Sequence, residues 1–235
     1  MKAFISSLLA VWFGLVLLFG ALGTFVRPPG TPPLPILFGC AVPLLVFAAW
    51  YWGSTAFRAA VLSVDPVFLT AIQAWRAAGL GFLALTVHGI LPGQFAWPAG
   101  LGDIAIGVTA PWVAMALLRR SGFASSRLFV VWNLLGILDL VVAVGMGALN
   151  SGFLPGLGGN VTTSAMAQLP LVLIPAYLVP LFVMLHVAVL IQARRHALAA
   201  VSTATSAVPA RPALLERENR GAVTVGGAKL WVAVD

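Results

Sequence analysis

The sequence predicts an all-α fold, a polytopic bundle of six transmembrane helices, from its composition, its long apolar runs and the placement of its basic residues. Of 235 residues, 61% are apolar and only 8% are charged, whereas a soluble domain carries about 25% charged residues. A chain with so few charges uses lipid as the solvent for most of its surface. Because a helix needs about 20 apolar residues to cross the hydrocarbon, the runs before Arg194 have room for six spans and short loops.

Turn and capping signals set the bounds of the six expected spans. The prolines that follow Arg27 cannot continue a helix, Asp65-Pro66 is typical of a helix start, and Pro92-Gly93 ends a helix. The expected spans are residues 4–26, 34–57, 66–90, 97–118, 128–148 and 169–191, so that residues 1–194 form the bundle. Residues 195–235 lack helical apolar periodicity, and we expect them to form a disordered cytoplasmic tail.

The basic residues outside the expected spans fall almost entirely on one side of the bundle. Only Arg27 lies on the other side, so the positive-inside rule places both termini in the cytoplasm. The residues that share a side are Lys2, Arg58, Arg119, Arg120, Arg127, Arg194, Arg195, Arg211, Arg217, Arg220 and Lys229. The net charge of +7 therefore reflects topology. We expect a multi-pass protein of the inner (plasma) membrane whose partner is the lipid bilayer. We do not expect it to bind nucleic acid.

Three ionisable side chains are expected inside the apolar runs: Arg76, Asp103 and Asp139. Each costs about 2.5 to 3.5 kcal/mol on insertion scales, so each needs a partner or a purpose. Arg76 and Asp139 lie ten or eleven residues from the cytoplasmic end of their spans, at a depth of roughly 15 Å. Small residues share the helix faces of the two aspartates and favour close helix contacts there. They are Gly100, Gly107, Ala110 and Ala114 on the fourth span, and Gly136, Ala143 and Gly147 on the fifth.

Two carboxylates and one guanidinium leave one negative charge without a partner. Either one aspartate is protonated, or a cation or a cationic ligand completes the site, which Gln73 and Asn133 would also line. The alternative is a structural Arg/Asp pair, with the second aspartate bonded to Asn133, a hydroxyl or water. We assign Asp103 as the functional group and Asp139 as the structural partner, because Asp103 follows a glycine-rich, proline-broken segment that would admit water.

The sequence offers no constellation for a cofactor or for catalysis. His88 and His186 are expected near opposite ends of their spans, and His196 lies in the tail, so no haem or metal ligand set is predicted. Cys40 is the single cysteine and sits in an apolar run, where it packs as a small hydrophobe. No nucleophile and base pair stands out, so we do not expect an enzyme.

Several short stretches resemble a group of uncharacterised bacterial multipass membrane proteins. The resemblance covers most of residues 1–195 and implies a multipass helical fold without any activity or site residue. Its motifs are Ala74-Trp75-Arg76, Leu91-Pro92-Gly93, Pro98-Ala99-Gly100-Leu101-Gly102-Asp103, Trp132-Asn133-Leu134-Leu135-Gly136, Val161-Thr162-Thr163 and Leu169-Pro170.

Two functional classes remain open from the sequence. The first is a small transporter, channel or ligand-binding protein that uses the buried polar cluster for a proton, a cation or a small molecule. The second is a non-catalytic membrane subunit or assembly factor, in which the charges are structural and the lipid-facing surfaces serve a membrane protein partner or a second copy. A water-filled cavity at the aspartates would favour the first class, and a dry core with a flat apolar groove the second.

Overall fold

The computed structural model describes residues 2–154, 160–206, 220–225 and 228–233. The chain divides into two compact units, Met1–Arg195 and His196–Asp235. Its helices are α1 Lys2–Ala21, α2 Leu34–Gly53, α3 Thr55–Leu62, α4 Pro66–Ile72, η1 Gln73–Gly79, α5 Leu80–Val87, α6 Gly93–Arg119, η2 Phe123–Ser125, α7 Arg127–Leu149, η3 Thr163–Ala167, η4 Ile174–Leu178 and α8 Val179–Ser206. The strands are β1 Arg220–Val225 and β2 Ala228–Ala233.

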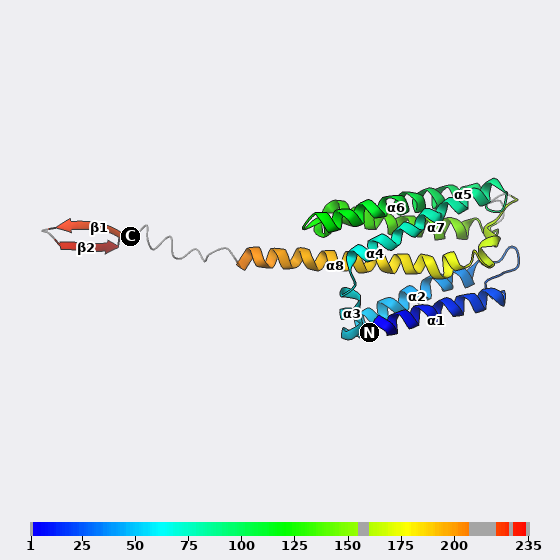
Figure 1. Cartoon of the computed structure of the whole chain (residues 1–235), viewed down its shortest axis with the longest axis horizontal. Coiled ribbons are helices and arrows are strands. Elements are labelled where there is room, and N and C mark those ends of the chain that lie inside the picture. The colour runs from blue at the N-terminus through cyan, green and yellow to red at the C-terminus, as the bar shows by residue number, and fades with distance from the viewer. Residues whose placement is uncertain (1, 155–159, 207–219, 226–227, 234–235) are drawn as a thin grey trace. The chain divides into compact units, whose positions relative to one another are not determined.

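Six helices in the described residues are long and apolar enough to cross a membrane, which confirms the predicted number. They are α1, α2, the composite α4–η1–α5, α6, α7 and the composite of η4 with α8 up to Arg195. The first unit is all-helical over its described residues, as the sequence predicted. Figure 1 shows these helices running back and forth along one direction.

Several helix bounds differ from the expected ones. Helix α1 ends at Ala21 and not at residue 26, and α6 begins at Gly93 and not at residue 97. Two further differences have identifiable reasons. The second helix was expected to reach residue 57, but α2 ends at Gly53 because the Ser54 hydroxyl caps a new helix, α3, by accepting from Phe57 N at 3.2 Å. The last helix was expected to begin at residue 169, but residues 169–172 form turns around Pro170 and the helix begins as a π-helix, η4, at Ile174. The capping role of Asp65 is confirmed, since its carboxylate accepts from Val67 N at 2.8 Å.

Helix α6 contacts several other elements of the helical unit. It packs against α4, η1, α5 and α7, so it contacts the whole length of the composite third helix. Helices α1 and α2 instead pack mainly on η4, and most of their residues are exposed. The α1–α2 pair is therefore a peripheral element, attached to the rest through the start of the last helix (Figure 1).

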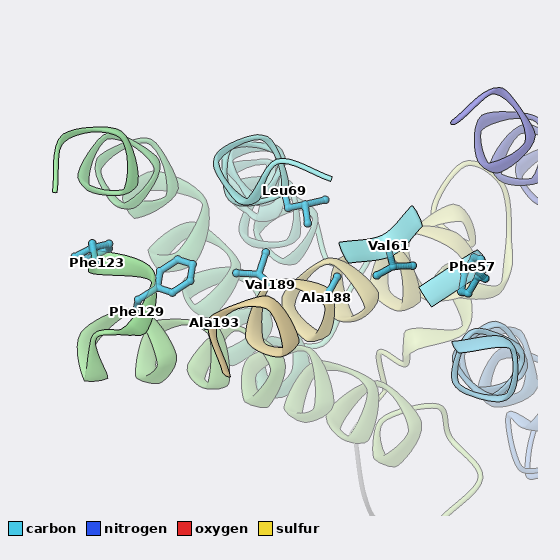
Figure 2. Packing of buried hydrophobic residues seen from close by; sticks show 8 residues of the cluster. All are labelled: Phe57, Val61, Leu69, Phe123, Phe129, Ala188, Val189 and Ala193. Carbon is cyan, nitrogen blue, oxygen red and sulfur yellow. The ribbon is translucent and has the colours of Figure 1, made fainter. Parts of the chain in front are cut away.

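A buried hydrophobic cluster fixes the rotation of α8 (Figure 2). It joins α3, α4, η2, α7 and α8, and van der Waals packing of this kind is what holds helices together where water is absent. Its members are Phe57, Val61, Leu69, Phe123, Phe129, Ala188, Val189 and Ala193. Since Ala188 and Val189 lie two and three residues after His186 on the same helix, the cluster also directs the imidazole into the bundle.

The described part of the second unit contains regular structure. Helix α8 continues to Ser206, and β1 and β2 pair antiparallel with Arg220 opposite Ala233 and Val225 opposite Ala228. Composition predicted no regular element after Arg194, because the tail lacks the helical period of 3.6 residues. Its runs of Val, Leu and Trp around two glycines carry a strand pattern, which a search for helical periodicity does not detect.

Candidate functional site

Arg76 lies at the centre of the composite third helix, on a 3₁₀ segment. In η1 the chain makes three residues per turn, so residues three apart lie directly above one another. Gln73, Arg76 and Gly79 are spaced in this way and all three are buried. A short 3₁₀ stretch within a long helix thus presents the guanidinium and its neighbours as one line facing the bundle interior.

Arg76 binds both predicted aspartates at once. Its Nε donates to Asp103 Oδ1 at 2.7 Å, and its Nη2 donates to Asp139 Oδ2. The arginine side chain is fully buried, while those of Asp103 and Asp139 keep 14% and 12% of their surface accessible. The buried Arg/Asp pairing predicted from the sequence is therefore confirmed, and α6 and α7 are tied to the third helix by charge-assisted hydrogen bonds.

The remaining donors of Arg76 lead to a second group of polar side chains. Nη1 donates to Gly136 O at 3.1 Å and lies 3.2 Å from His186 Nε2. His186 Nδ1 lies 2.8 Å from Asn133 Oδ1, and Asn133 Nδ2 donates to Phe129 O at 2.8 Å. Because the Asn133 oxygen is the acceptor, Nδ1 carries the imidazole proton and Nε2 accepts from Arg76, which makes His186 neutral.

His186 is the member of this cluster that the sequence interpretation missed. It was placed near one end of its span because the helix was expected to begin at residue 169. With the start at Ile174, His186 lies twelve residues into the helix, at a depth of about 18 Å, and it is only 1% exposed. Asn133, which was expected near an aspartate, joins the cluster through this imidazole instead.

Gln73 does not join the Arg76 cluster through any hydrogen bond described by the structure. Its Nε2 donates to Phe182 O on α8 at 3.3 Å, and its Oε1 has no partner among the described residues. Gln73 therefore ties the third helix to α8 one 3₁₀ turn away from the guanidinium.

Four glycines make room for the charged cluster. A Cβ at Gly79 would collide with Asp103, one at Gly102 with the Asp139 carboxylate, and one at Gly136 with the His186 ring. A Cβ at Gly107 would collide with the backbone where Arg76 joins the next residue, so α6 and η1 touch backbone to backbone there. Small residues allow this close approach, as predicted for Gly107 and Gly136.

Two cavities meet at Asp103. The larger, of about 290 Å³, extends from the α1–α2 loop, where Arg27 and Pro29 line it, to Asp103 in the interior. The smaller, of about 70 Å³, is lined by both Arg76 and Asp103. The two cavities share Asp103 and four apolar side chains, Phe82, Leu140, Ile174 and Val179, whereas Asp139 is not among the described residues that line either one.

No curated protein and no solved structure matches the chain. A family model, described as a domain of unknown function, DUF8737, matches residues 31–194. The match begins after α1 and includes the whole Arg76 cluster, and it agrees with the resemblance noted from the sequence in carrying no activity. Because the match covers more than half of the chain, the chain belongs to the DUF8737 family.

Proposed function

We propose that the chain is a six-pass integral protein of the bacterial inner (plasma) membrane that binds a proton or a cation at Asp103, as a small transporter, channel or ligand-binding protein. The observation that carries the proposal is the cavity of about 290 Å³ that leads from the α1–α2 loop to this carboxylate. A charged side chain inside a bilayer faces a cavity or the bundle interior and serves function by default. Asp103 lies in the bundle interior and also lines the cavity.

The charge balance supports a cation site. Arg76 carries one positive charge and contacts two carboxylates, while the hydrogen-bond directions make His186 neutral. With both aspartates ionised, the cluster holds one excess negative charge. In a low-dielectric interior that charge is expensive unless a proton or a cation offsets it.

The two aspartates have different surroundings, and these support different roles. Asp139 packs against the backbone of α6 at Gly102 and is not among the described residues that line the cavities. Asp103 lines both cavities. We therefore take Asp139 as the structural partner of Arg76 and Asp103 as the group that exchanges its proton or cation.

The proposed orientation rests on the positive-inside rule. The chain segments at one end of the bundle, α3, the connection between α6 and α7, and the region around Arg195, carry most of the basic residues described in the helical unit (Figure 1). They are Arg58, Arg119, Arg120, Arg127, Arg194 and Arg195, against Arg27 at the other end. With the basic end and both termini in the cytoplasm, the large cavity opens on the opposite side of the membrane.

The test is labelling with N,N′-dicyclohexylcarbodiimide, an apolar reagent that modifies protonated carboxyl groups within membranes, followed by mass spectrometry of the full chain in liposomes. We expect labelling of Asp103, less of it in alkaline buffer, and none in Asp103→Asn. Asp65→Asn is the matched control, because it makes the same chemical change at an exposed helix cap that asparagine also satisfies. Labelling of Asp139 in place of Asp103, or of no carboxyl group in the bundle, would refute the proposed site.

A non-catalytic subunit or assembly factor is the second candidate, and one observation favours it. Helices α1 and α2 expose large apolar side chains such as Val11 and Leu45, which are 59% and 68% exposed, so they offer surface for a membrane protein partner or a second copy. Under this alternative, cysteines placed at those two positions cross-link to another chain in native membranes, and Asp103→Asn has no effect on the protein's role. Under the first proposal those two positions face lipid, and cysteines placed there do not cross-link to another chain.

A further inference from the structure

We infer that the ligand of the large cavity is an amphipathic organic monocation, whose apolar body fills the cavity and whose positive charge rests on Asp103 in competition with a proton. This inference rests on the proposed function, because it names the ligand class for the same site.

The lining of the cavity fits an apolar body. Its volume of about 290 Å³ is close to the lower end of small-molecule sites, at about 300 Å³. Three phenylalanines line it, and two of them, Phe82 and Phe95, meet edge to face with their centroids 5.4 Å apart. Aromatic faces attract organic cations. A metal ion would instead need several oxygen ligands, and Asp103 is the one carboxylate among the described lining residues.

The charges around Asp103 favour a single positive charge. Arg76 faces it from η1 and also binds Asp139 of α7, and neutral His186 contacts the same guanidinium from α8. One monocation offsets the excess negative charge of this group. Arg27 is exposed at the loop end of the cavity, where solvent and salt screen its repulsion.

A hydrogen-bonding group lies among the loop-side residues of the cavity. Ser151 lines the cavity, and its buried hydroxyl oxygen has no hydrogen-bond partner among the described residues. A buried hydroxyl without a hydrogen-bond partner is unfavourable. A polar substituent on the ligand would satisfy it, which makes a purely hydrocarbon cation a weaker ligand than one with a polar end.

A proton and the cation compete because either one cancels the same charge. When Asp103 is protonated, the cluster is neutral and no longer attracts a cation. Binding of the cation to the ionised carboxylate therefore requires that the proton leave to solvent, one proton for each cation bound. The affinity for the cation is accordingly expected to rise with pH.

The experiment uses 1-methyl-4-phenylpyridinium, a flat monocation, with the purified full chain in non-ionic detergent and isothermal titration calorimetry. Two probes of matched shape serve as controls, the uncharged 4-methylbiphenyl and the anionic biphenyl-4-carboxylate. We expect the cation to bind more tightly than either control and more tightly in alkaline buffer. Asp103→Asn should weaken its binding about ten- to a hundredfold, because the pyridinium loses the opposite charge beside it, while Asp65→Asn should leave it unchanged.

Ala143→Leu is a second variant that narrows the cavity without changing a charge. It should weaken binding of the cation and leave carbodiimide labelling of Asp103 intact. Equal binding of the cation to wild type and Asp103→Asn, or tighter binding of the anion through Arg27, would overturn the inference. If Asp103 is labelled by carbodiimide but the cation does not bind, the proposed function stands and only the ligand class is wrong.

Discussion

Replacement of Arg76 by leucine should remove most of the stability of the bundle. The guanidinium serves four acceptors: two carboxylates, the Gly136 carbonyl and His186 Nε2. Leaving a buried charge without its partner typically costs about 3 to 5 kcal/mol, and a buried imidazole nitrogen without a donor adds about 1 to 3 kcal/mol. Total stabilities are about 5 to 15 kcal/mol, so Arg76→Leu should be poorly folded.

Second-site variants separate the two carboxylates. In Arg76→Leu/Asp139→Asn the remaining charge is on Asp103, which lines the cavities and can be hydrated or protonated there. In Arg76→Leu/Asp103→Asn the remaining charge is on Asp139. The first double variant should therefore recover more of the lost stability than the second, and the unsatisfied His186 should keep both below wild type. The stability of Arg76→Lys should lie between those of Arg76→Leu and wild type, because an ammonium group has three donors for the four acceptors.

Thermal unfolding followed by circular dichroism in non-ionic detergent, together with the amount of protein in the membrane, measures these differences. The reasoning is refuted if Arg76→Leu unfolds at the wild-type temperature, since the network would then contribute nothing measurable. It is also refuted if the double variant that retains Asp139 is the more stable of the two, because the roles of the aspartates would then be exchanged.

Three further predictions concern packing, topology and the tail. Gly102→Ala should lower the stability by about 1 to 3 kcal/mol, because the added methyl group displaces Asp139 from its ion pair. Gly14→Ala, whose methyl group meets nothing within 4 Å, should be neutral or stabilising by about 0.5 to 1 kcal/mol. Unfolding temperatures measure the difference, and equal values for the two variants would contradict the packing argument. The topology is tested with single cysteines introduced into a variant without Cys40. Cysteines within residues 160–168 should react with an impermeant maleimide from outside the cell, and a cysteine beside Arg120 should react only from inside. The reverse pattern would overturn the topology. Removal of the chain after residue 200 should leave accumulation and unfolding temperature of the helical unit unchanged, and loss of either would make the tail structural.

Composition and periodicity were sufficient to predict the six long helices, because length and apolarity are properties of each helix alone. That Arg76 would have a carboxylate partner was also predictable, since charges in an apolar interior have few alternatives, but that it binds both Asp103 and Asp139 was left open. Both inferences use local sequence only.

The features that sequence reasoning missed depend on backbone irregularity. The line of Gln73, Arg76 and Gly79 exists because residues 73–79 form a 3₁₀ helix, and no residue in that run marks the change of period. His186 enters the cluster because the last helix begins with a π-helical turn at Ile174 after the turns around Pro170. The glycine at position 136 was the available signal, since it leaves space on the face that the imidazole occupies.

The position of Arg76 along the chain has a consequence for biosynthesis. The third candidate span has a mean hydropathy of 1.4, the lowest of the six in the described residues. The arginine at its centre opposes insertion by about 2.5 to 3.5 kcal/mol. Its two carboxylate partners follow 27 and 63 residues later, so they leave the ribosome after it. In a bilayer, the third helix therefore becomes stable only once α6 and α7 have joined it, and its integration is completed by helices that are made later.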